Sequence, residues 1–299
     1  MSGELDRTTL RASGLRFSAI EVGLKDDPAV LCLHGFPDSP STFRHQFGPL
    51  AEAGYRVIAP TLRGYEPSSV PVDGDHSLVA LADDVAGWLD DLGVDTAHLI
   101  GHDWGAAILD VAATRHPDRV RTVTTLAIPP LRRIPDAVRR VPRQLLRSWY
   151  MTFFQLPGVP ERVLATDDWR LLRRLWRVWS PGYTLSEGDW SELRDRFEQP
   201  GVIDCALAYY RQNATPPILL GLRSTPAMEP AETPVPVLIV HGSDDGCMDR
   251  RLFDHTIRAE DHPAGVRRVE VDGAGHFVHL ERPDVVNPEL VDHLGGGDR

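Results

Sequence analysis

The chain has 299 residues, of which 42% are hydrophobic and 25% charged, so it can bury a sizeable core and is not intrinsically disordered. Its formal net charge is −11, from 32 basic and 43 acidic residues, which argues against nucleic acid as the main partner. Three cysteines without a C-x-x-C pair favour neither a disulfide framework nor a thiolate metal site. Neither an apolar leader nor a stretch of membrane-spanning length is visible, so we expect a cytoplasmic protein without a membrane span.

Short apolar segments that end in a turn residue recur along the chain. We expect strands at residues 15–22, 29–33, 57–59, 98–100, 120–127, 237–240 and 266–271. Helical periodicity fills intervals between them, at residues 41–53, 77–92, 104–116 and 248–258. This alternation predicts a mostly parallel, doubly wound sheet with helices on both faces. Catalytic groups should then lie in the turns just beyond the carboxyl ends of the strands.

The alternation stops in the middle of the chain, where Arg, Leu, Trp and Pro are frequent at helical spacing. We predict that residues 130–233 form an inserted helical cap between two parts of one core, residues 1–129 and 234–299. Residues 131–180 hold eleven arginines and four acidic residues, a net charge of +7. We interpret these arginines as solvated helix faces that pair with the acidic core, and a funnel for anionic substrates is the alternative.

The segment Gly101-His102-Asp103-Trp104-Gly105 stands where a predicted buried strand meets a predicted helix. Small residues two positions before and after the central residue are typical of a nucleophile elbow, a sharp turn that lifts its central side chain above the sheet. The pattern therefore predicts that Asp103 is a nucleophile. An N-cap role for Asp103 at the start of the helix is the alternative.

Two further candidates follow Asp103 in the order nucleophile, acid, base. Asp245 and His276 each lie on a short glycine-containing turn directly after a predicted strand. We predict that Asp245 orients His276, the base. Asp244 and Asp249 are alternative acids, although Asp249 is also placed to cap the next helix.

Over nearly its whole length, the chain resembles the α/β-hydrolase-fold epoxide hydrolases. His34-Gly35-Phe36-Pro37 resembles the oxyanion-hole motif of that family, and residues 101–105 resemble its nucleophile elbow. Gly275-His276-Phe277, with residues 279–283, resembles its base segment. The resemblance implies an α/β-hydrolase fold with an inserted cap, and a reaction in which no metal or organic cofactor takes part.

Two segments of the predicted cap also resemble motifs of that family. Residues 148–155 are similar to its first cap motif and residues 208–213 to its second, and this implies that Tyr150 and Tyr210 point over the nucleophile. Tyr209 is the alternative to Tyr210. A phenol with a pKa of ~10 stays neutral at physiological pH and can donate a proton to the alkoxide that forms when an epoxide opens.

We therefore expect a two-step hydrolysis of a small-molecule epoxide. Asp103 attacks an epoxide carbon, and water activated by His276 and Asp245 then hydrolyses the resulting ester to release a vicinal diol. The backbone N–H groups of Phe36 and Trp104 would form the oxyanion hole.

Two other functions stay open. Haloalkane and haloacid dehalogenases share the fold and the aspartate, but Phe36 occupies the place of a halide-binding donor, and Trp104 and Ala107 replace the arginines of a fluoroacetate-type enzyme. The third possibility is a hydrolase scaffold that binds a small molecule without turnover, for which loss of a triad member would be the signature.

Overall fold

The computed structural model describes residues 6–223, 225–228 and 231–296, and its centre is an eight-stranded sheet. The strands lie in the order β1-β2-β4-β3-β5-β6-β7-β8; β3 to β8 pair in parallel, and β1 and β2 are antiparallel additions at one edge. Their bounds are β1 Asp6–Ala12, β2 Leu15–Val22, β3 Ala29–Leu33, β4 Arg56–Pro60, β5 Ala97–His102, β6 Val120–Leu126, β7 Val237–Gly242 and β8 Val266–Val271.

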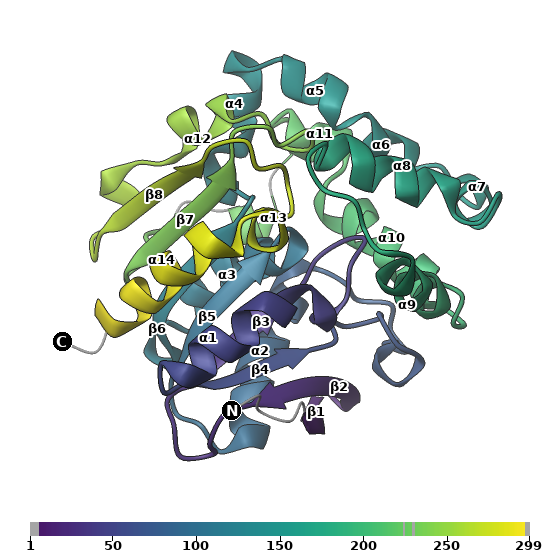
Figure 1. Ribbon diagram of the computed structural model, residues 1–299. Helices are drawn as coiled ribbons and strands as arrows, with labels where there is room; N and C mark the ends of the chain where they lie inside the picture. Colours follow the sequence, from purple (N-terminus) through teal and green to yellow (C-terminus); the bar gives the residue numbers. More distant parts are fainter. Residues whose placement is uncertain (1–5, 224, 229–230, 297–299) are drawn as a thin grey trace.

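Helices cover both faces of this sheet (Figure 1). The core helices are α1 Arg44–Glu52, α2 Leu78–Leu92, α3 Trp104–Arg115, α12 Arg251–Thr256, α13 Val278–Glu281 and α14 Pro283–Gly296, with short 3₁₀ turns at Pro40–Phe43, Pro67–Ser69, Pro117–Arg119 and Ala259–Asp261. One hydrophobic cluster joins α2 and α3 to the sheet, and a second joins α1 and α14 to its other face. The predicted mostly parallel, doubly wound sheet is confirmed.

Between β6 and β7 the chain forms a separate group of short helices at one end of the sheet (Figure 1). They are α4 Ile134–Arg140, α5 Arg143–Arg147, α6 Trp149–Phe153, α7 Val159–Leu164, α8 Arg170–Trp179, α9 Glu187–Phe197, α10 Val202–Asn213 and α11 Pro216–Leu219, with 3₁₀ turns at Leu131–Arg133 and Pro226–Met228. We call this group the cap. None of the helices in the described parts of the chain is both long and apolar enough to cross a membrane.

Some elements differ from the expectations. Strand β1 was not expected, and the helix expected at 248–258 is shorter, since α12 spans only Arg251–Thr256. Two C-terminal helices, α13 and α14, were also not expected. The second of these, α14, ends at Gly296, and residues 297–299 lie outside the described residues.

Candidate active site

Asp103 occupies the sharp turn between the end of β5 and the start of α3. Its backbone φ of +50° lies in a region that residues other than glycine rarely adopt, so the turn is strained. Glycine is required on either side: a Cβ on Gly101 would lie 2.5 Å from the Gly105 backbone, and one on Gly105 would lie 2.0 Å from the Leu33 carbonyl oxygen. The Asp103 carboxylate makes no capping hydrogen bond to α3, so both of its oxygens can contact residues outside this helix.

The two oxygens of the Asp103 carboxylate face different partners. Oδ1 accepts a 2.7 Å hydrogen bond from the Phe36 backbone N–H, and Oδ2 lies 3.5 Å from His276 Nε2. Trp104 is the first residue of α3, so its N–H belongs to the unpaired donors at the helix N-terminus. Burial alone would raise the pKa of Asp103, but its contact with His276 and the charge of that ring hold the pKa below its ordinary value.

His276 contacts one of the three aspartates considered as the acid. Its Nδ1 lies 2.9 Å from Asp245 Oδ2, while Asp245 Oδ1 accepts hydrogen bonds from two backbone N–H groups of the same turn. Asp244 is exposed, and Asp249 is paired with Arg251 at 2.8 Å. The structure thus brings Asp103, His276 and Asp245 together and leaves the two alternatives outside.

The ionisation of His276 depends on both carboxylates. Burial would lower the pKa of this imidazole, but the charge of Asp245 and the contact with Asp103 outweigh burial and raise the pKa to about 10. His276 is therefore an imidazolium at neutral pH while Asp103 keeps its charge.

A cavity begins at Asp103 and extends beneath the cap. Its walls are formed mainly by apolar side chains from α2, α3, the cap and the loops after β6 and β7: Leu78, Trp104, Ala107, Ile128, Leu131, Ile134, Met151, Tyr210, Ala214, Ile218, Leu219 and Met248, with Asn213 as a polar member. A site of this composition favours an apolar ligand.

The three candidate tyrosines differ in what their hydroxyls contact. Tyr210 lines the cavity with Asp103, and neither its hydroxyl nor the Trp104 indole N–H makes a well-formed hydrogen bond within the described chain. The Tyr209 hydroxyl instead donates to the Arg63 carbonyl at 2.8 Å. Tyr150 packs against Tyr210 with ring centroids 5.8 Å apart, but its hydroxyl lies 3.4 Å from Cys247 Sγ.

The oxyanion-hole segment is held by buried contacts. His34 Nδ1 is 3.0 Å from the Gly35 carbonyl and its Nε2 accepts from the Leu62 N–H, which fixes the tautomer. Burial lowers the pKa of His34 to about 3, so the ring is neutral and supports the loop. Gly35 has to be glycine because a Cβ there would lie 2.4 Å from Asp103 Cβ, and the Pro37 carbonyl accepts from the Trp176 indole at 2.9 Å.

The end of α8 connects the acid turn to the base turn, a feature that the sequence analysis missed. The Trp179 carbonyl accepts hydrogen bonds from the N–H groups of Gly246 and His276, both at 3.0 Å. A Cβ on Gly246 would lie 1.9 Å from the Val178 carbonyl oxygen, so glycine is needed for this close approach. The glycines beside Asp245 and His276 were the available signal, but nothing in the sequence showed which segment approaches them.

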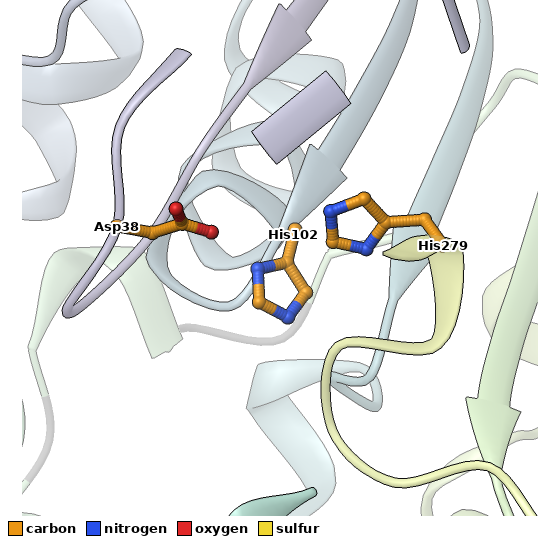
Figure 2. Close-up of side chains that lie close together, drawn as sticks. All are labelled: Asp38, His102 and His279. Carbon is orange, nitrogen blue, oxygen red and sulfur yellow. The ribbon is translucent and has the colours of Figure 1, made fainter. Parts of the chain in front are cut away.

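Two buried groups of side chains have donor atoms suited to a metal ion. In one, Asp38, His102 and His279 lie close together, with donor atoms within 4.8 Å of one another (Figure 2). The second group consists of Asp245, Cys247 and His276, again within 4.8 Å. The second group overlaps the acid and base of the site, and none of the members of either group lines the cavity that begins at Asp103.

Comparisons with known proteins agree with this geometry. The family described as alpha/beta hydrolase fold matches residues 28–283. The chain is 29% identical to the AB hydrolase superfamily protein YfhM of Bacillus subtilis (95% of this chain, 96% of the relative), and 31% identical to Epoxide hydrolase A of Mycobacterium tuberculosis (95% of both). The crystal structure of Epoxide Hydrolase A from Mycobacterium thermoresistibile superposes with a TM-score of 0.80 at 30% identity, over 98% of this chain and 99% of that one. The chain belongs to the epoxide hydrolases of the α/β-hydrolase fold family.

Proposed function

We propose that this protein hydrolyses small apolar epoxides to vicinal diols through a covalent ester on Asp103. The observation that carries the proposal is an aspartate at the elbow that faces both a His–Asp pair and a cavity lined by a tyrosine. A carboxylate that attacks an ester carbonyl gives an anhydride that returns to reactants, which argues against an esterase. Attack on the strained carbon of an epoxide gives a stable alkyl ester, so the reaction divides into two easier steps.

In the first step, Asp103 Oδ2 forms a bond to an epoxide carbon while Oδ1 stays on the Phe36 N–H. The ring C–O bond breaks, and its electron pair goes to the ring oxygen, which takes a proton from Tyr210 with Tyr150 as the second donor. Burial and the charge of Asp103 raise the pKa of the Tyr210 phenol well above 10, so it is a neutral donor at physiological pH.

In the second step, the ionisation of His276 changes because the ester on Asp103 carries no charge. The imidazolium then loses one of the two influences that raise its pKa, and the proton that it releases restores the Tyr210 phenol, which gave its proton to the ring oxygen. Neutral His276, oriented by Asp245, removes a proton from water, which adds to the ester carbonyl. The tetrahedral intermediate then collapses: the acyl C–O bond breaks, and the diol oxygen leaves with the proton of the new carboxyl group, so that Asp103 is again a carboxylate and His276 an imidazolium. The oxyanion rests on the N–H groups of Phe36 and Trp104, and loss of one such donor costs on the order of 10²-fold in rate.

A single-turnover reaction in ¹⁸O-water tests this mechanism with 1,2-epoxyhexane and excess enzyme. Water adds to the ester carbonyl, so we expect the label in the peptide that contains Asp103 and unlabelled oxygen in the diol. The His276→Ala variant should form the ester and accumulate it, which intact-mass spectrometry detects, and His276→Ala with Asp103→Asn is the control that gains no mass. Label in the diol alone, or an unmodified His276→Ala protein, contradicts the two-step reaction.

Halide release is the competing reaction, and the tyrosines discriminate between the two. A halide leaves as a stable anion that needs no proton, whereas an alkoxide in a dry cavity needs a donor. Replacing both Tyr150 and Tyr210 by Phe should therefore nearly remove epoxide opening without a comparable effect on a 1-haloalkane. Halide release that exceeds diol formation and survives the double substitution identifies a dehalogenase. Absence of any adduct with either substrate class favours a non-catalytic binding scaffold.

We further propose that the reaction takes place in the cytoplasm, with the epoxide and water as the partners. Three free cysteines, all buried, support a reducing compartment. The apolar cavity wall supports an apolar epoxide.

A further inference from the structure

Cys247 is a buried thiol inside the proposed active site for which the two-step reaction has no use. It lies two residues after Asp245, and its backbone N–H donates to Asp245 Oδ1 at 2.7 Å. The next residue, Met248, lines the cavity that begins at Asp103. On its other side the thiol lies 3.4 Å from the Tyr150 hydroxyl.

The thiol, the acid and the base form a set of metal ligands. One donor atom each from Asp245, Cys247 and His276 lie within 4.8 Å of one another, and all three side chains are buried. A tetrahedral zinc ion with bonds of 2.0 to 2.3 Å separates its ligand atoms by about 3.3 to 3.6 Å. Separations of up to 4.8 Å would have to shorten by about 1 Å, and Asp245 Oδ2 and His276 Nδ1, which are 2.9 Å apart, would have to separate by about 0.4 Å to admit an ion.

The charges around His276 favour a cation. The carboxylates of Asp103 and Asp245 flank the ring at 3.5 and 2.9 Å. The guanidinium of Arg147, whose charge would oppose a bound cation, is engaged with backbone carbonyls of this turn. A divalent ion bound here replaces the proton between imidazole and carboxylate and adds a thiolate bond. The thiol and the imidazolium each release one proton to solvent, and no electron is transferred.

We propose that Asp245, Cys247 and His276 bind a thiophilic divalent cation such as Zn²⁺ or Cd²⁺, and that the bound ion inhibits the enzyme. Inhibition rests on the proposed function, because the ion coordinates the imidazole of His276, which activates water in the second step. The ester on Asp103 could then form but would not be hydrolysed. The thiolate gives the site its preference for soft ions over Mg²⁺ and Ca²⁺, which prefer oxygen ligands.

The group of Asp38, His102 and His279 is a weaker candidate for a metal site. Asp38 Oδ2 and the Nδ1 atoms of both histidines have no hydrogen-bond partner among the described residues. However, the group offers no thiolate and contains only one carboxylate, so it lacks the preference for soft ions that Cys247 gives to the other group. His279 Nε2 is also held by Thr42 Oγ1 at 2.7 Å.

Binding is tested with Co²⁺, whose thiolate complexes absorb in the near ultraviolet and whose visible bands report tetrahedral coordination. We expect both signals in the full-length wild-type protein and loss of the thiolate band in Cys247→Ala. The matched control is Cys205→Ala, which removes another buried thiol on α10 and should keep both signals. A wild-type protein without the thiolate band, or a band that survives in Cys247→Ala and disappears in Cys205→Ala, overturns the proposal.

Inhibition is measured with Zn²⁺, and each variant is compared with its own metal-free rate. We expect the zinc concentration for half inhibition to rise at least tenfold in Cys247→Ala and to stay unchanged in Cys205→Ala, with full recovery after a chelator. Zinc-treated wild type should also accumulate the ester on Asp103. Equal zinc sensitivity of all three proteins contradicts the proposal. If no epoxide is turned over, the proposed function fails, but the cobalt spectra still decide whether the metal site exists.

Discussion

His276 connects the two proposed half-reactions through a change in its own pKa. In the resting site the pKa is about 10, because the charge of Asp245 and the contact with Asp103 outweigh the effect of burial. A permanently protonated ring could not remove a proton from water. In the proposed reaction, forming the ester removes the charge of Asp103, so His276 can accept a proton only after the nucleophile has reacted.

A substitution that imitates the uncharged ester tests this coupling. In Asp103→Asn the charge of Asp103 is gone while burial persists, so we expect the pKa of His276 to fall below its wild-type value of about 10. The pKa is measured by following the His276 ring resonances in an NMR pH titration. Asp244→Asn, which removes an exposed carboxylate of the acid turn, is the control and should leave the pKa unchanged. An unchanged pKa in Asp103→Asn would show that Asp245 alone holds the proton.

Tyr209 and Tyr210 are adjacent residues of α10 with different surroundings, so they form a matched pair. Tyr210→Phe removes the hydroxyl that lines the cavity and should slow ring opening about tenfold or more, with little change in stability. Tyr209→Phe leaves the Arg63 carbonyl without its partner and should lower the free energy of unfolding by about 1 to 3 kcal/mol.

Single-turnover rates and urea unfolding of both variants separate the two roles. The rate of ring opening in Tyr209→Phe should stay near that of the wild type, which makes this variant the control for Tyr210→Phe. The opposite result, slow ring opening in Tyr209→Phe alone, would exchange the assignments.

Sequence spacing pointed to individual site residues at positions where the backbone geometry dictates the residue type. The glycines around Asp103 fit only a close approach of strand and helix, so they pointed to the residue between them. The choice between Tyr209 and Tyr210 could not be made in this way, because neighbours on a helix point about 100° apart and each direction depends on tertiary packing. The nearness of Cys247 to the acid and base is likewise a contact that spacing alone does not reveal.

Among the elements, buried strands were the most predictable. All five residues of β3 are buried between β4 and β5, and they form a continuous apolar run in the sequence. Strand β1 was missed because it lies at the sheet edge and most of its residues are exposed or half-buried. Many cap helices have four to seven residues, for instance α5 and α6, which is too short for helical periodicity to define their ends.

Helix α8 contributes to the site through the residue that follows it. Ser180 Oγ accepts a 3.0 Å hydrogen bond from the buried N–H of Phe277, next to the proposed base. Ser180→Ala leaves this N–H unpaired, so we expect the free energy of unfolding to fall by about 1 to 3 kcal/mol in urea denaturation. We also expect slower hydrolysis of the ester on Asp103, because the base turn loses one of its supports.

Ser191→Ala is the control for this variant, since the Ser191 hydroxyl accepts a 3.3 Å hydrogen bond from a half-exposed arginine of its own helix, far from the base turn in sequence. This variant should keep the stability and both rates of the wild type. A Ser180→Ala protein as stable as the wild type would mean that water replaces the serine hydroxyl.

On the scale of the whole molecule, arginines of the cap contact acidic residues of the core. Arg133 forms two hydrogen bonds with Asp261, at 2.6 and 2.8 Å, and Arg132 lies 3.7 Å from Asp110. Other arginines pair within the cap, such as Arg173 with Glu187 at 3.0 Å. The positive charge of the cap therefore helps to hold the cap on the anionic core. The pairs between cap arginines and core aspartates should make the attachment of the cap depend on pH and salt.

Arg133 and Asp261 provide the test of this attachment. The hydrogen bond from Arg133 lowers the pKa of Asp261 below its ordinary value, so the pair stabilises the folded protein above the unfolded-state pKa of ~3.9 and loses this contribution as the pH falls through the folded-state pKa. Because the pair is partly exposed, Arg133→Ala should lower the free energy of unfolding by only about 0.2 to 1 kcal/mol near neutral pH at low salt. The difference from the wild type should shrink in high salt and disappear in acid. Arg170→Ala, which removes a more exposed pair inside the cap, should show no such difference. A loss of stability in Arg133→Ala that is equal at every pH and salt concentration would mean that the arginine acts through packing of its side chain and not through its charge.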